Sequence, residues 1–113
     1  MAGFSLGHTQ LLLFQQGQTS TDIQLSKSDP TLVIPKHGLQ TSTSGEPAPR
    51  LYTHFCLAVE KPEDVDEWEA ELRNKNVKIL GKASWPPGGK SIYFADPDEH
   101  IGEIASKGIW PNY

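Results

Sequence analysis

The sequence is poor in cysteine, in long apolar runs and in clustered basic residues, and each shortage disfavours a class of protein. With Cys56 as the one cysteine among 113 residues, no internal disulfide can form. The longest apolar run near the N-terminus, Leu11 to Phe14, is far too short to span a bilayer, and no charged segment precedes it as in a signal peptide. The net charge is −4, and no basic stripe favours nucleic-acid binding. We therefore expect a soluble cytoplasmic protein with one modest core.

The first half of the chain is mostly polar. Residues 4 to 14 predict a strand or a tight hairpin, because two short apolar segments flank a plausible two-residue turn, Gly7-His8. Residues 15 to 50 are rich in Gln, Ser, Thr, Gly and Pro, with one apolar island that ends at Pro35. Loops of this length are uncommon in compact domains, so we expect this stretch to be partly mobile or to act as a lid.

The second half of the chain predicts the order β-α-β-β-β. The expected elements are strands over residues 51–59, 77–80, 90–95 and 100–105, and a helix that begins at Pro62 and ends before a left-handed cap at Asn76. Val65, Trp68 and Leu72 form one apolar stripe on this helix, which predicts that Trp68 lies in the core. The stripe would pack on the strand face that carries Phe55, Leu57, Val59, Ile92 and Phe94.

The opposite face of the predicted sheet is unusually polar. Side chains alternate along a strand, so this face carries His54, Cys56, Ser91, Tyr93 and Glu103. Such a face is too polar for a second core and too mixed for plain surface, which indicates the lining of a concave ligand pocket. Trp85 either forms a wall of this pocket or caps the end of the sheet.

This arrangement resembles the vicinal oxygen chelate superfamily, which includes glyoxalases, bleomycin-resistance proteins and extradiol dioxygenases. The resemblance rests on the strand from His54 to Val59, the segment from Trp85 to Phe94, the turn Asp96-Pro97-Asp98 and the tail from Gly108 to Tyr113. It implies an α+β fold with a curved mixed sheet. Residues 51–113 would form a complete βαβββ module, and residues 1–50 a partial first module with a polar loop.

The resemblance also implies roles for two residues. His54 and Glu103 match the metal-ligating positions of the second module, for a divalent ion such as Zn, Ni, Mn or Fe, and Glu103 also matches the catalytic base of the glyoxalases.

The chain departs from the family pattern in two ways. The metal-bearing first strand of the first module has no counterpart, and Leu12 lies near that module's usual carboxylate position. Glu99 also replaces a turn glycine, at a cost of roughly 1 kcal/mol if φ is positive.

Three functions remain open at this point. One is a protein that binds a small molecule in the concave pocket without a metal, through Cys56, Trp85, Ser91 and Tyr93. The second is a metal-dependent lyase, isomerase or dioxygenase that acts on vicinal-oxygen substrates through His54 and Glu103. The third is a shortened member with no activity of the parental type. We expect a homodimer, because a partial first module leaves sheet edges open.

Four further residues receive weaker predictions. His8 is either a third metal ligand or a solvent-exposed turn residue. His37 and His100 are predicted to face solvent. Cys56 is either a thiolate nucleophile or, as we favour, a small buried side chain.

Overall fold

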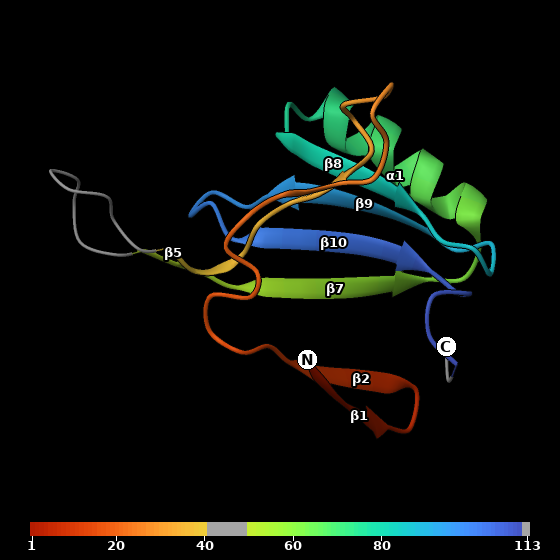
Figure 1. Cartoon of the computed structure of the whole chain (residues 1–113). Helices are drawn as coiled ribbons and strands as arrows, with labels where there is room; N and C mark the ends of the chain where they lie inside the picture. The colour runs from red at the N-terminus through yellow and green to blue at the C-terminus, as the bar shows by residue number, and fades with distance from the viewer. Residues whose placement is uncertain (41–49, 112–113) are drawn as a thin grey trace, which may run out of the picture.

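The computed structural model describes residues 1–40 and 50–111, and its centre is a mixed four-stranded sheet with a helix on one face (Figure 1). The strand order is β7-β10-β9-β8. These elements span β7 His54–Val59, α1 Pro62–Asn74, β8 Ile79–Ser84, β9 Lys90–Ala95 and β10 Ile101–Ser106. Strand β10 is parallel to β7 and antiparallel to β9, and all six of its residues are buried. The predicted α+β class and the β-α-β-β-β order are confirmed.

Helix α1 begins where the sequence predicts, because Pro62 occupies its first turn and the Lys61 N–H donates to the Asp64 carboxylate at 2.9 Å. Asn76 has a φ of 57°, as expected for the predicted left-handed cap. Val65 and Leu72 are buried against Ile92 and Ile104 of the sheet. The helix therefore covers the apolar face of β9 and β10.

Trp68 does not lie in the core, so this prediction is wrong. Its residue surface is 46% exposed, and Phe55 and Leu57 on β7 are also exposed, at 39% and 56%. Helical periodicity placed Trp68 correctly on the apolar stripe. However, β7 is the edge of the sheet, and no other described element covers the helix beyond that edge.

The predicted N-terminal hairpin is confirmed as β1 Ala2–Leu6 and β2 Thr9–Leu13. Gly7 in its turn has a φ of 63°, a conformation that glycine adopts without a steric penalty. The hairpin forms its own two-stranded sheet, and several of its large apolar side chains are exposed. Figure 1 shows it as a separate ribbon, apart from the four-stranded sheet.

The described part of the polar segment, residues 15–40, lies across the sheet face opposite α1 (Figure 1). It contains β3 Ile23–Gln24 paired with β4 Val33–Ile34, and β5 Gly38–Gln40 paired with β6 Arg50–Tyr52. Ile34 packs on the cluster formed by Ala83, Tyr93 and Ile101. The close approach of β4 to β8 depends on Gly81, because a Cβ there would lie 2.2 Å from the Val33 carbonyl oxygen. Residues 15–40 thus cover part of the sheet, whereas residues 41–49 of the predicted loop lie outside the described residues.

The bounds of two predicted strands differ by more than one residue in the structure. The expected strand 51–59 is divided at Thr53 into β6 and β7, and the expected strand 77–80 becomes β8, which extends to Ser84. Glu99 has a φ of 68°, so it takes the left-handed conformation despite its side chain. Asp96 supports this turn, because its carboxylate accepts hydrogen bonds from the N–H groups of Asp98 and His100.

No helix in the described part of the chain is long and apolar enough to cross a membrane.

Candidate functional site

The centre of the candidate site is a contact between His54 and Glu103 on neighbouring parallel strands. In the register of β7 and β10, His54 lies opposite Ile101, and Glu103 lies opposite Cys56. His54 and Glu103 therefore share one sheet face and are offset by two residues along it. The Nε2 atom of His54 is 3.0 Å from Oε2 of Glu103, and the two side chains are 20% and 11% exposed.

The other ring nitrogen of His54 determines what this contact requires. Nδ1 lies 3.2 Å from the carbonyl oxygen of Ile101. Because a carbonyl only accepts hydrogen bonds, the Nδ1 hydrogen is donated to it and Nε2 presents its lone pair to Glu103. Two electron-rich atoms then face each other, so one cation, either a proton or a metal ion, must lie between them.

Glu103 also interacts with two neighbours on the same face, the Tyr93 hydroxyl and the Cys56 thiol. Desolvation is the main reason that the pKa values of both groups are raised, and the negative charge of Glu103 raises them further. Cys56 lies on the edge strand β7 and is exposed. The expectation of a buried side chain is therefore wrong. Its raised pKa disfavours a thiolate nucleophile at neutral pH.

Ser91 and Trp85 lie farther along the same face and contact each other. The indole Nε1 of Trp85 donates to Ser91 Oγ at 2.9 Å, and Ser91 is 2% exposed. Trp85 also packs on the cluster of Ala83, Tyr93 and Ile101. The register thus brings five predicted pocket residues to one side of the sheet: His54, Cys56, Ser91, Tyr93 and Glu103. The hydrogen bond to Ser91 places Trp85 beside them.

His37 is a member of this site that the sequence reading missed, because it was predicted to face solvent. Its ring lies 4.9 Å from the ring of His54 and 5.0 Å from that of Phe14, measured between centroids. Its Nε2 atom is buried and has no hydrogen-bond partner among the described residues. Desolvation lowers the pKa of His37, and the nearby His54 lowers it further, while Glu103 opposes the shift.

The two remaining histidines have other positions. His8 lies exposed in the turn of the β1–β2 hairpin. His100 is half-buried, so the prediction that it faces solvent is wrong, and its Nδ1 accepts the Thr53 N–H at 3.0 Å. Within residues 1–40 and 50–111, no three His, Cys, Asp or Glu side chains are arranged to hold one metal ion.

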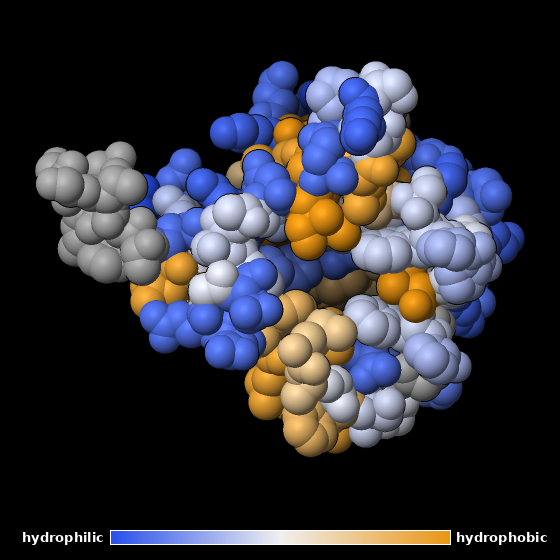
Figure 2. Space-filling model, viewed as in Figure 1, coloured by the Kyte–Doolittle hydropathy of each residue, from blue (hydrophilic) through white to orange (hydrophobic). Residues whose placement is uncertain are grey.

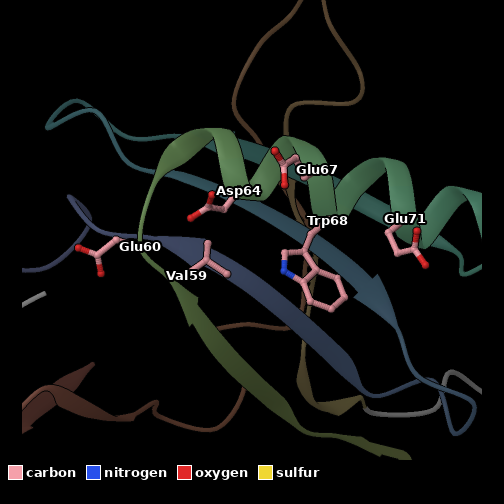
Figure 3. Close-up of a pocket in the computed structure, with 6 residues that line it drawn as sticks. All are labelled: Val59, Glu60, Asp64, Glu67, Trp68 and Glu71. Carbon is pink, nitrogen blue, oxygen red and sulfur yellow. The ribbon is translucent and has the colours of Figure 1, made fainter.

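The face that carries His54 and Glu103 is hollowed over β7 and β10, between the hairpin and the segment 15–40 (Figure 2). A separate pocket of about 510 Å³ lies between the end of β7 and α1 (Figure 3). Its lining consists of Val59, Glu60, Asp64, Glu67, Trp68 and Glu71. None of the predicted site residues lines it, so this acidic pocket on the helix side is distinct from the candidate site.

Comparison with known proteins gives relatives for part of the sequence. No protein-family model matches the chain. Metallothiol transferase FosB from Staphylococcus saprophyticus is 43% identical over 54 residues, which are 47% of this chain and 35% of that protein. Metallothiol transferase FosB from Bacillus licheniformis is 33% identical over 60 residues, which are 52% of this chain and 38% of that protein. The match therefore spans little more than a third of the length of these curated relatives.

A solved structure matches over more of the chain. Lactoylglutathione lyase from Agrobacterium tumefaciens superposes with a TM-score of 0.52 and 25% sequence identity. The superposition covers 96% of this chain and 69% of that protein, so it includes most of the N-terminal half as well as the four-stranded sheet.

Proposed function

The chain belongs to the vicinal oxygen chelate superfamily and is a glyoxalase/bleomycin-resistance-like protein, and on that basis we propose that it binds a small oxygen-bearing molecule at His54 and Glu103. The observation that carries this proposal is the 3.0 Å contact between His54 Nε2 and Glu103 Oε2 in a hollowed sheet face. The contact requires one cation, and we propose that this cation is a divalent metal in the functional protein.

The chemistry of the two residues supports a metal. An imidazole nitrogen and a carboxylate oxygen suit Zn, Ni, Mn or Fe(II). Histidines that ligate metals almost always donate their other N–H to a carbonyl or carboxylate, as His54 does to Ile101. The relatives named metallothiol transferase support the same proposal.

Each residue of the site then has a role. A bound metal ion would polarise vicinal oxygens of the substrate and stabilise developing negative charge. Glu103, next to Tyr93 and Cys56, would be the base that accepts a proton from the substrate. Cys56 and Tyr93 would line the ligand site together with Trp85 and Ser91.

A second candidate is a metal-free binding protein of the bleomycin-resistance kind. It is favoured by the lack of three convergent donors within residues 1–40 and 50–111, since catalytic zinc sites usually take three protein ligands. In this case the cation between His54 and Glu103 is a proton. Tyr93 and Trp85 would then supply apolar surface for the ligand.

The open edges of the structure support a proposal about assembly. We propose that residues 1–50 are a partial module, that residues 51–113 are a complete one, and that two copies pair through these edges. Strand β7 has no described partner on its outer side and exposes Phe55 and Leu57. An exposed apolar edge of this kind favours pairing with another chain.

A ligand titration followed by amide NMR tests the site and separates the two candidates. The probes are small vicinal-oxygen compounds and S-lactoylglutathione, each added with and without Zn²⁺. We expect shifts at residues 53–56 and 101–103 that require Zn²⁺ and disappear in His54→Ala. Shifts without Zn²⁺ at these residues would favour the metal-free binder. Shifts confined to other residues, or none with any probe, would contradict the assignment of the site.

A further inference from the structure

His37 is attached to the site by a firmly held backbone. Its N–H donates to the Thr19 carbonyl at 3.0 Å, and its own carbonyl accepts from Thr19 Oγ1 at 2.9 Å and from Gln40 Nε2 at 3.0 Å. Three hydrogen bonds therefore fix where the segment 15–40 places this residue over the sheet. The side chain, by contrast, makes ring contacts to Phe14 and His54 among the residues that the structure describes.

The ring of His37 carries a buried nitrogen, Nε2, that lacks a hydrogen-bond partner among the described residues. Leaving such an atom unsatisfied is unfavourable. Buried polar atoms of this kind call for an explanation such as a missing ion or ligand.

We infer that His37 is this chain's own third donor to a divalent cation held by His54 and Glu103, supplied by the covering segment instead of by a first-module strand. The inference rests on the proposed metal role of His54 and Glu103. Two nitrogens bound to one tetrahedral Zn²⁺ lie roughly 3.3 Å apart. The three side chains do not converge on one point in the described geometry. The His37 side chain must therefore turn to share the ion, and its ring centroid lies 4.9 Å from that of His54.

The other candidate donors are less suited to this position. His8 is in the exposed hairpin turn, and His100 Nδ1 is already engaged by the Thr53 N–H. The Cys56 thiol donates to the Leu57 carbonyl oxygen at 3.9 Å. His37 alone among them combines proximity to His54 with an unsatisfied ring nitrogen.

The test is a titration of the metal-stripped full chain with Co²⁺, followed by its visible absorption spectrum and by calorimetry. His37→Phe keeps an aromatic ring between Phe14 and His54 but has no nitrogen donor. His8→Ala is the matched control, because it removes an exposed histidine. We expect His37→Phe to weaken Co²⁺ binding by at least about tenfold and to change the absorption spectrum, while His8→Ala has no effect.

Two results would overturn the inference, and they are distinguishable. If His37→Phe binds Co²⁺ as the wild type does while His54→Ala does not, His37 only packs over the site and the proposed metal role stands. If the wild type binds no Co²⁺ at all, the proposed metal role fails together with the inference. Circular dichroism of each variant establishes that a loss of binding is not a loss of fold.

Discussion

His54 donates its Nδ1 hydrogen to the carbonyl of Ile101, the residue directly opposite it on β10, and this bond directs Nε2 at Glu103. The backbone of one strand thereby orients the functional side chain of its neighbour. Glu103 is mostly buried, lies 3.0 Å from His54 Nε2 and interacts with Tyr93 and Cys56 on the same face. Removing one partner from such a cluster leaves polar atoms unsatisfied in a site of low solvent exposure.

We first predict that His54→Ala destabilises the metal-free protein by about 1 to 3 kcal/mol, because it leaves the Glu103 carboxylate without its cationic or hydrogen-bonded partner. Glu103→Gln should cost less, because the Gln amide can donate to the Nε2 lone pair of His54. Urea denaturation at pH 7 measures both. Equal losses for the two variants would show that Nε2 does not present a lone pair.

The second prediction concerns the thiol of Cys56 in metal-free protein. Its raised pKa means that the folded chain holds the proton more tightly than the unfolded chain does. Alkylation by iodoacetamide at pH 8 should therefore be at least about tenfold slower in the native protein than in urea. The native rate should rise with pH through a midpoint above that of a free cysteine.

Glu103→Gln provides the control for this measurement. The substitution removes the negative charge that contributes to the raised pKa, so the thiol should react faster than in the wild type. A native alkylation rate equal to that in urea would contradict the described environment of Cys56.

The third prediction tests the cover over the site. Gly81→Ala should destabilise the protein by about 1 to 3 kcal/mol, because the added Cβ meets the Val33 carbonyl and forces β4 away from β8. Gly3→Ala is the matched control, since a Cβ there meets Leu12 Cδ2 at an ordinary 3.4 Å. Thermal unfolding of the two variants should differ clearly, and equal midpoints would show that the segment 15–40 does not pack on the sheet.

The fourth prediction concerns assembly. Light scattering after size exclusion should show a dimer at micromolar concentration, and Leu57→Glu should shift it to a monomer because it places a charge on the open β7 edge. Leu25→Glu, at a comparably exposed position in the covering segment, should leave the dimer intact. A stable wild-type monomer at this concentration would rule out the proposed pairing.

The common face of His54, Tyr93 and Glu103 was predictable because it depends on short-range rules. Strands alternate with period 2, and the elements from residue 54 to residue 106 follow one another with short connections. The same local rules gave the helix start at Pro62, the cap at Asn76 and the hairpin turn at Gly7.

The positions of His37 and Trp68 were not predictable from local patterns. His37 reaches His54 only because residues 15–40 fold back across the sheet, and this polar segment has no periodicity that indicates its path. Trp68 lies on the apolar stripe of α1 as expected. Its exposure depends on what lies beyond the edge strand β7, which is a property of the tertiary structure.

The most direct test of the central claim is a calorimetric titration of the metal-stripped wild-type chain with Zn²⁺, with His54→Ala as the matched variant. We predict binding at micromolar concentration or tighter that is lost in His54→Ala, since the cation between Nε2 and Oε2 would then be a metal ion. Absence of Zn²⁺, Ni²⁺, Mn²⁺ and Fe²⁺ binding to the wild type, or equal Zn²⁺ binding by the variant, would contradict the claim that His54 and Glu103 form a metal site.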